Sequence, residues 1–353
     1  MRAAIVGGGT GGHVIPALAI ARELRERYSA EIIFIGTSRG IETRLVPQAG
    51  FPLHLVQVGQ LKNVSLTRRA RTLSDIPRAV FVCRKLFADF RPQLVIGVGG
   101  YASGPGMLAA ILMRIPTLAF EPNLVPGFAN RMVARLVTAA AVHFEETKRF
   151  FRNAVVTGVP VRQAFFRIPE RSFAPPGSLL VFGGSQGARV LNQTMIDSIP
   201  KWKELGIRVR HQTGERDFDK VDSAYKQAGF SAQVSRFVDD MPSAFAEADL
   251  VLCRSGASTV GEITAAGKPA IFVPFPFAAD DHQRKNAEAL EKAGGARLIP
   301  ESELTPERLS TAVADLLRSP AILNQMSMKA RSLSHPEAVR EIGEMAAKLA
   351  TKT

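Results

Sequence analysis

His13 is the first candidate for a catalytic group, because it directly follows a run of glycines. The run occupies residues 7–12, between an apolar segment and an alanine-rich segment typical of a helix. The positive end of a helix dipole disfavours imidazolium, so a histidine placed there stays neutral and can accept a proton. A histidine with a purely structural role is the alternative interpretation.

Two glutamates are further candidates for chemistry. Glu121 follows the apolar segment 117–120 and precedes Pro122, which favours an extended exit from a strand. It is the second candidate for a catalytic base, and an ordinary surface glutamate is the alternative. Glu262 lies about one helical turn into the segment after 254–256, where a carboxylate can accept hydrogen bonds from both hydroxyls of a ribose. A glutamate exposed on a capped helix is the alternative there.

Three glycine turns could bind anions. They occupy residues 7–12, 97–106 and 183–187, and each follows an apolar, strand-like segment. A strand that turns through glycines into a helix exposes backbone N–H groups at the positive end of the helix dipole. The first turn fits the dinucleotide fingerprint, but no Gly-Lys-Ser/Thr follows it, so an ATP-type phosphate loop is not indicated. Close packing of a helix on a sheet is the alternative for the turn at 97–106.

Two polar segments in the second half complete the set. Small and hydroxyl-bearing residues at 254–262 can bring N–H groups and hydroxyls to a phosphate. The cluster at 280–286 follows the rigid, proline-containing segment 273–276 and presents amide and carboxyl groups suited to a sugar. Its two aspartates and its histidine are adjacent in sequence and point away from one another, so we expect no metal site.

These groups need a scaffold, and the apolar pattern predicts an α/β fold. Strand-like segments alternate with helical segments, which is typical of parallel sheets covered by helices on both faces. In the first half we expect strands at 3–6, 31–35, 53–58, 94–98, 117–120, 139–142 and 154–156. In the second half we expect strands at 178–182, 209–212, 233–237, 250–253, 270–273 and 296–299. Each half opens with a strand, a glycine turn and a helix, so we predict two Rossmann-like domains with a ligand cleft between them, the plan called GT-B.

The breaks in this pattern set the expected domain boundaries. We expect an N-terminal domain over residues 1–160, a linker over 161–177 and a C-terminal domain over 178–335. The last segment, 336–353, is expected to form a helix that can pack back on the N-terminal domain. At 353 residues the chain is long enough for two domains, each with its own core.

The net charge of +13 is concentrated in the first half. Residues 1–160 hold 20 Lys and Arg against 9 Asp and Glu, whereas residues 161–353 hold 25 against 23. Nucleic acid, an anionic membrane and an anionic substrate are the candidate partners of such a basic half. Residues 62–91 carry eight Lys and Arg against two Asp, and the apolar residues among them include Phe81, Val82, Leu86 and Phe90. A basic, partly apolar surface predicts docking on anionic lipid, and a solvated basic face over ordinary core is the alternative.

The apolar runs and the cysteines argue against a membrane-spanning, secreted or disulfide-linked protein. No apolar run approaches the roughly 20 residues that span a bilayer, and the first residues lack the apolar region of a signal peptide, so we expect a cytoplasmic protein. Cys83 and Cys253 have no ligand spacing around them, so neither a disulfide framework nor a zinc site is indicated.

Five motifs taken together resemble the MurG family. They lie in order at residues 8–17, 99–105, 158–162, 183–188 and 254–259, and the resemblance covers about residues 3–300. That family transfers N-acetylglucosamine from its UDP sugar to undecaprenyl-pyrophosphoryl-N-acetylmuramoyl-pentapeptide in peptidoglycan synthesis. The resemblance implies an inverting hexosyltransferase that attaches the sugar to the C4 hydroxyl of the lipid-linked acceptor and needs no cofactor. It also implies a peripheral protein on the cytoplasmic face of the bacterial inner membrane, with anionic inner-leaflet lipids and no nucleic acid as partners.

The resemblance assigns roles to residues of the first half. Thr10, Gly11 and Gly12 match the amino-terminal nucleotide-sugar loop of the family. Asn123 matches an asparagine that touches the transferred sugar. The family commonly has His-Glu-Gln-Asn where this chain has Phe-Glu-Pro-Asn at 120–123, so roles that rest on that histidine or glutamine do not transfer.

The resemblance assigns the donor site mainly to the second half. Arg162 and Ser185 match groups near the diphosphate, and Val238 matches a residue whose backbone faces uracil. Gln283 matches a glutamine that binds the sugar. The helix that binds ribose and phosphate is matched by Ala257, Ser258, Thr259, Val260, Gly261 and Glu262. Helix dipoles, Ser185 and Arg162 would then stabilise the departing UDP without a metal.

Three alternatives remain open at this point. Another GT-B transferase acting on a UDP sugar would share most of these features. An NAD(P)-dependent dehydrogenase should have an acid after its second strand, but this chain has Thr-Ser-Arg at 37–39, where the arginine could suit NADP. A basic module for nucleic acid or membrane would explain the charge, although no known nucleic-acid motif is present.

Overall fold

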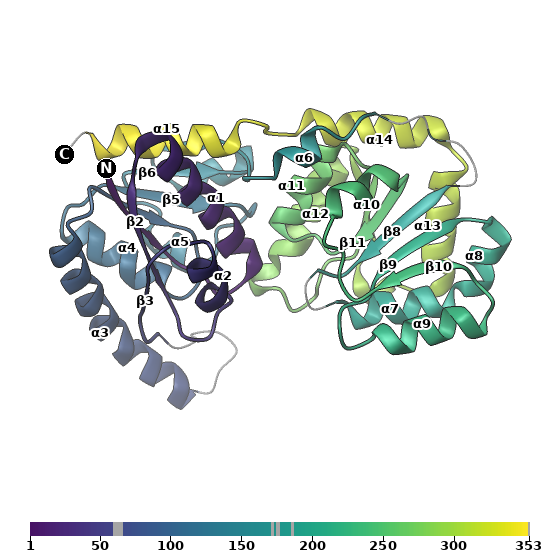
Figure 1. The fold of residues 1–353 in the computed structure, drawn as a ribbon, viewed down its shortest axis with the longest axis horizontal. Coiled ribbons are helices and arrows are strands. Elements are labelled where there is room, and N and C mark those ends of the chain that lie inside the picture. The colour runs from purple at the N-terminus through teal and green to yellow at the C-terminus, as the bar shows by residue number, and fades with distance from the viewer. Residues whose placement is uncertain (59–65, 171–172, 174–176, 185–186, 352–353) are drawn as a thin grey trace. The chain divides into compact units, whose positions relative to one another are not determined.

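The computed structural model describes residues 1–58, 66–170, 173, 177–184 and 187–351, without the side chains of residues 66–74 and of Ala279. The chain divides into two compact units (Figure 1). Unit 1 comprises Met1–Pro160 and Glu337–Thr353, and unit 2 comprises Val161–Pro336. The segment 161–177, which we expected to form a separate linker, thus belongs to unit 2.

Unit 1 contains a seven-stranded parallel sheet with the order β3-β2-β1-β4-β5-β6-β7. The strands are β1 Arg2–Val6, β2 Glu31–Gly36, β3 Leu53–Leu55, β4 Leu94–Gly97, β5 Thr117–Glu121, β6 Ala139–Val142 and β7 Ala154–Val156. Alternate residues of β1 enter different cores, because Ala3 and Ile5 lie on one face and Ala4 and Val6 on the other. Both faces are therefore buried, which explains why the strands were readable as continuous apolar runs.

Helices cover both faces of this sheet. They are α1 Gly11–Tyr28, α2 Glu42–Gln48, α3 Leu66–Phe90, α4 Ser103–Leu112, α5 Phe128–Val133, the 3-10 helix η1 Glu145–Phe150 and α15 Ala338–Ala350. α1 and α15 lie side by side and share one core, whereas α3, α4 and α5 contribute to the other (Figure 1). Ile342, Ala346 and Ala350 repeat every four residues and form the buried stripe of α15. The C-terminal helix is therefore part of the N-terminal unit.

Unit 2 contains a six-stranded parallel sheet with the order β10-β9-β8-β11-β12-β13. The strands are β8 Ser178–Phe182, β9 Arg208–Gln212, β10 Ala232–Ser235, β11 Leu250–Cys253, β12 Ala270–Phe272 and β13 Ala296–Leu298. The helices are α6 Gln163–Phe166, α7 Arg189–Asp197, α8 Ile199–Leu205, α9 Phe218–Gln227, α10 Met241–Glu247, α11 Ala257–Ala266, η2 Ala279–Asp281, α12 His282–Lys292, η3 Glu301–Glu303, α13 Pro306–Leu317 and α14 Pro320–Ser332. All thirteen predicted strands are present, and the predicted pair of Rossmann-like domains is confirmed.

The strand orders place two topological switch points. The order reverses between β1 and β4 in unit 1 and between β8 and β11 in unit 2. Ligands of open parallel sheets bind outside the carboxyl ends of the strands at such points. The glycine turns after β1, β4 and β8 and the motif after β11 all start there. The sheets thus bring the sequence motifs of each unit together.

α3 carries the basic and apolar surface. The helix contains Pro77 and continues through it. Phe81 is 69 % exposed and Val82 is also exposed, as predicted. The prediction was wrong for Leu86 and Phe90, which are partly buried against the core because they lie three residues after the buried Cys83 and Phe87. The basic side chains that precede Asp75 in this segment lie outside the described residues.

Among the helices that the structure describes, none combines the length and the apolarity required to cross a bilayer.

The two cysteines, Cys83 and Cys253, are free and buried, and burial raises the pKa of the Cys83 thiol to about 12. A thiol with such a pKa stays protonated near neutral pH and is inert as a nucleophile.

Candidate active site

The turn after β1 packs directly on the turn after β4. Gly7, Gly8 and Gly9 have φ values of 136°, 144° and 95°, which side chains rarely permit. The N–H of Gly8 donates to the carbonyl of Gly99 at 3.1 Å. A Cβ atom at Gly7 would lie 2.2 Å from the Gly99 oxygen, and one at Gly100 would lie 2.2 Å from the Gly8 oxygen. Glycine is therefore required in these turns by the close approach of two backbones.

A buried carboxylate, Glu42, lies beneath the first turn, and the sequence analysis missed it. Its side chain is 1 % exposed. Oε2 accepts a hydrogen bond from Gly9 N at 2.7 Å, and Oε1 accepts from Thr37 N and Thr37 Oγ1, each at 3.0 Å. A Cβ atom at Gly36 or Gly40 would collide with this carboxylate. A sequence signal could have identified Glu42: a glutamate shortly after the end of a strand, preceded by two glycines, Gly36 and Gly40, that make room for its side chain.

The predicted nucleotide-sugar loop and His13 lie at the start of α1. Thr10 is extended, and Gly11 and Gly12 form the first helical turn, whose N–H groups have no preceding helix carbonyl to bind. His13 Nδ1 lies 3.2 Å from Gly8 O and 3.3 Å from Thr10 Oγ1. A carbonyl oxygen can only accept, so the bond to Gly8 puts the proton on Nδ1 and the lone pair on Nε2. The ring is thus held in a form in which Nε2 can act as a base.

Glu121 ends β5 and is 2 % exposed. Oε1 accepts from the backbone N and Nδ2 of Asn123, and Oε2 accepts from Gly127 N and Asn130 Nδ2, each at 3.0 Å. Burial raises the pKa of this carboxyl, and the four N–H donors lower it. Four donors fill the lone-pair positions of a carboxylate. The arrangement favours a role in holding the loop that carries Asn123 over a role as the base.

In unit 2, Arg162 and Glu262 come together. Arg162 precedes α6, which contacts α11, and its Nη2 lies 4.0 Å from Glu262 Oε1. The side chain of Glu262 is 24 % exposed, and that of Arg162 is 55 % exposed. Burial raises the pKa of the Glu262 carboxyl to about 7, and the charge of Arg162 opposes this effect. Near neutral pH this carboxyl therefore lies between its neutral and charged forms.

The other predicted ribose and phosphate residues form the start of α11. The helix begins after Gly256, an extended residue that offers no side-chain cap. The hydroxyl of Ser258 is buried and has no hydrogen-bond partner in the part of the chain that the structure describes. An uncapped helix start beside an unpartnered hydroxyl suits an anionic group. The residues that share this segment are Ala257, Ser258, Thr259, Val260, Gly261 and Glu262.

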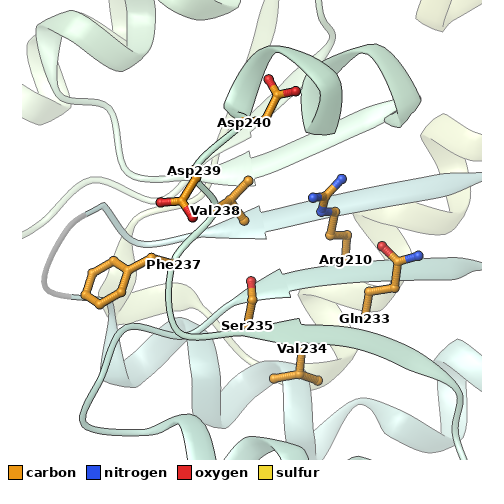
Figure 2. Close-up of a pocket in the computed structure, with 8 residues that line it drawn as sticks. All are labelled: Arg210, Gln233, Val234, Ser235, Phe237, Val238, Asp239 and Asp240. Carbon is orange, nitrogen blue, oxygen red and sulfur yellow. The ribbon is translucent and has the colours of Figure 1, made fainter.

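A pocket of about 400 Å³ lies between β9, β10 and the loop that leads to α10 (Figure 2). It is lined by Arg210, Gln233, Val234, Ser235, Phe237, Val238, Asp239 and Asp240. Val238, for which the resemblance implies contact with uracil, is one of these residues. Hydrogen bonds from Ser243 lower the pKa of the Asp240 carboxyl, and the charges of Arg162 and Arg210 lower it further. The charge of Arg162 therefore acts both on Glu262 and on the edge of this pocket.

Gln283 lies between two loops of unit 2. Its Oε1 accepts from Phe275 N at 3.0 Å, and its backbone oxygen accepts from Ser255 Oγ at 2.8 Å. The amide Nε2 is thus the side-chain group that can donate to a sugar hydroxyl. Arg254, one residue before Ser255, forms a largely buried ion pair with Glu301 at 2.5 Å, which stabilises the motif after β11.

Two predicted features complete the inventory. Ser185, which the resemblance places near the diphosphate, lies outside the residues that the structure describes. Within the described ranges, no group of three or more His, Cys, Asp and Glu side chains is arranged to hold a metal ion.

Comparisons with known proteins cover both units. The chain matches the Glycosyltransferase family 28 N-terminal domain over residues 3–142 and the Glycosyltransferase family 28 C-terminal domain over residues 178–342. A protein of Solibacter usitatus (strain Ellin6076) is 45% identical over 97% of this chain and 94% of its own length. A protein of Myxococcus xanthus (strain DK1622) is 43% identical over 100% of this chain and 94% of its own length. Both are named UDP-N-acetylglucosamine--N-acetylmuramyl-(pentapeptide) pyrophosphoryl-undecaprenol N-acetylglucosamine transferase.

A solved structure agrees with these relatives. The crystal structure of Acinetobacter baumannii MurG is 32% identical in sequence and superimposes with a TM-score of 0.84, covering 98% of this chain and 99% of that protein. Fold, motif order and full-length identity thus point to one group of enzymes. The chain belongs to the MurG family within glycosyltransferase family 28.

Proposed function

We propose that this chain transfers N-acetylglucosamine from UDP-N-acetylglucosamine to the C4 hydroxyl of undecaprenyl-pyrophosphoryl-N-acetylmuramoyl-pentapeptide, with inversion to a β1→4 bond. The observation that carries this proposal is the 45% identity, over 97% of the chain, to a relative named for this transfer. We assign the acceptor and the membrane surface to unit 1 and the nucleotide sugar mainly to unit 2.

The donor groups of unit 2 divide the UDP sugar among them. Uracil lies against the backbone at Val238 in the pocket of Figure 2. The ionised carboxylate of Glu262 accepts hydrogen bonds from the two ribose hydroxyls, and Arg162 beside it attracts the diphosphate. The start of α11, with the unpartnered Ser258 hydroxyl, donates to phosphate oxygens. Gln283 Nε2 donates to the sugar.

The reaction then requires one proton transfer and one displacement. We assign the base to Nε2 of His13, because the bond from Nδ1 to Gly8 O leaves the lone pair there. As the proton of the C4 hydroxyl moves to Nε2, the hydroxyl oxygen attacks the anomeric carbon from the face opposite to UDP. The bond from that carbon to the diphosphate oxygen breaks, and the electron pair leaves with UDP. Positive charge at Arg162 and the N–H groups of helix starts stabilise the departing diphosphate.

We further propose that α3 docks unit 1 on the anionic inner leaflet. Phe81 is exposed on this helix, together with the basic residues Arg78, Arg84 and Lys85. Each basic residue near an anionic surface contributes roughly 1 kcal/mol, and the apolar side chain adds burial in the headgroup region. This placement would bring the enzyme to a membrane-embedded acceptor on the cytoplasmic side.

Incubation of the purified chain with radiolabelled UDP-N-acetylglucosamine and a short-chain form of the lipid acceptor tests the function. We expect label to appear in the lipid-linked product, and none to appear when either substrate is omitted. Quenching of intrinsic fluorescence by UDP but not by NADPH separates the proposal from a dehydrogenase. A chain that binds NADPH and forms no labelled lipid would contradict the assignment.

A further inference from the structure

One peptide group joins the buried carboxylate of Glu42 to His13. The peptide between Gly8 and Gly9 donates its N–H to Glu42 Oε2 at 2.7 Å. The carbonyl of the same peptide, Gly8 O, lies 3.2 Å from His13 Nδ1. The N–H and C=O of a peptide group are antiparallel and share one plane. The carboxylate, the peptide and the imidazole therefore form a continuous chain of two hydrogen bonds.

We propose that Glu42 is a positioning residue that fixes the tautomer and orientation of His13 through the peptide between Gly8 and Gly9. The carboxylate polarises this peptide, because a negative acceptor on the N–H draws electron density towards the carbonyl oxygen. That oxygen is then a stronger acceptor for the Nδ1 proton. When Nε2 takes a proton from a substrate hydroxyl, the same chain stabilises the imidazolium. This inference rests on the proposed role of His13 as the base.

The surroundings of Glu42 suit a fixed carboxylate. Its two oxygens accept three hydrogen bonds, from Gly9 on one oxygen and from Thr37 on the other. Gly36 and Gly40 leave only the space that the side chain fills. A buried carboxyl group with three hydrogen-bond donors and no spare space around it is held in one position. Its oxygen Oε2 thus stays at a constant distance from the peptide that contacts His13.

The glycine turn is held on both sides of this peptide. Gly8 N donates to Gly99 O at 3.1 Å, and Gly9 O accepts from Ile41 N at 3.4 Å. Within this frame, the bond to Glu42 Oε2 engages the N–H of the peptide whose carbonyl, Gly8 O, lies beside the imidazole. A Cβ atom at Gly8 would lie 2.6 Å from the Glu42 carboxyl carbon, so Glu42 also packs against this turn. Glu42 is thus the side chain that supports the orientation in which the Gly8 carbonyl meets the imidazole.

Nitrogen NMR of the full chain labelled with ¹⁵N-histidine tests the inference without reference to activity. The His13 resonances are identified by their absence in His13→Gln. At a pH where the ring is neutral, we expect the parent to show protonated Nδ1 and unprotonated Nε2. In Glu42→Gln, we expect the His13 tautomers to become mixed, because one amide cannot accept from both Gly9 and Thr37. Thr37→Val is the matched control: it removes one bond to Glu42, leaves the bond to Gly9, and should preserve the parent tautomer.

Kinetics provide the second readout. Glu42→Gln should lower kcat about 10- to 100-fold, a part of the roughly 10²- to 10⁴-fold contribution of a general base. The KM for UDP-N-acetylglucosamine should stay within about twofold, since a misaligned base weakens the transition state more than donor binding. Glu26→Gln removes the same charge from the exposed face of α1 and should leave both constants unchanged.

The outcomes separate this inference from the proposed function. A parent His13 with the proton on Nε2, or a Glu42→Gln variant with the parent tautomer and the parent kcat, overturns the role of Glu42. The parent spectrum needs no variant, so the test holds even if Glu42→Gln does not fold. If the tautomer depends on Glu42 but His13→Ala keeps full kcat, Glu42 still positions His13, and the assignment of the base is wrong.

Discussion

Binding of the donor should depend on pH through Glu262. Burial raises the pKa of this carboxyl to about 7 in the free protein, and only its ionised form can accept hydrogen bonds from both ribose hydroxyls. Binding therefore requires loss of a proton below this pH. We expect the affinity for UDP-N-acetylglucosamine to rise with pH and to level off above about pH 8.

The magnitude follows from the fraction of ionised carboxyl. With a pKa of about 7, roughly one tenth of the protein is ionised at pH 6 and about nine tenths at pH 8. The apparent Kd should therefore increase about tenfold between pH 8 and pH 6. Replacement of Glu262 by alanine should remove both hydrogen bonds and cost roughly 1.5–3 kcal/mol at pH 8, or about 10- to 150-fold in Kd.

The same pKa shift has a consequence for stability, with the opposite sign. Between the ordinary pKa of 4.5 and the raised value of about 7, the folded chain binds more protons at Glu262 than the unfolded chain. The free energy of unfolding should therefore decrease as pH rises through this range, by up to about 3 kcal/mol from this group. Glu262→Gln should remove that contribution.

Isothermal titration calorimetry with UDP-N-acetylglucosamine at several pH values measures the dependence. The UDP sugar is a diphosphate diester and has no group that titrates in this range, which makes it a better ligand than UDP. Glu262→Gln should bind more weakly at pH 8 with an affinity independent of pH, and Glu307→Gln, on the exposed start of α13, should behave as the parent. A parent affinity that is flat from pH 6 to 8, or an equal slope in Glu262→Gln, would refute the reasoning.

Three further expectations concern catalysis and the membrane. Activity should survive excess EDTA, because helix starts and Arg162 meet the diphosphate charge; complete loss on chelation, restored by magnesium, would reveal a metal requirement. His13→Ala should lower kcat about 10²- to 10⁴-fold with nearly unchanged binding of UDP. Glu121→Ala should also destabilise the fold, because four N–H donors lose their acceptor. If His13→Ala keeps the kcat of the parent, the role of base belongs to Glu121 instead. Charge reversal at Arg84 and Lys85 combined with Phe81→Ser should reduce both sedimentation with phosphatidylglycerol vesicles and activity on a membrane-embedded acceptor. Turnover of a water-soluble acceptor should stay near normal. Vesicle binding equal to that of the parent would contradict docking through α3.

The fold could be predicted from sequence because its strands are buried on both faces. Such strands are apolar runs separated by helical segments, and the sheet order then follows from the usual connections. The positions of the catalytic candidates were predictable for the same reason, since His13 and Glu121 lie at the carboxyl ends of β1 and β5, two strands of one parallel sheet. The strand ends differ by only a few residues from the predicted segments.

The environment of each group could not be predicted, because it depends on contacts between distant segments. Glu121 is a candidate base by sequence, but its hydrogen-bond donors include Gly127 and Asn130, six and nine residues later, which no local pattern identifies. Glu42 gains its significance only where the loop after β2 folds under the loop after β1. The raised pKa of Glu262 depends on burial within unit 2 and on the opposing charge of Arg162. Local pattern gives the type and position of a residue but not the partners that set its chemistry.

The most direct test of the central claim is structural analysis of the product formed from UDP-N-acetylglucosamine and the lipid-linked muramoyl-pentapeptide. We predict equimolar UDP and a disaccharide-linked lipid, in which proton coupling at the new anomeric carbon shows a β bond to C4 of the muramoyl sugar. Recovery of the lipid acceptor unchanged, with the nucleotide sugar either intact or epimerised, would contradict the account.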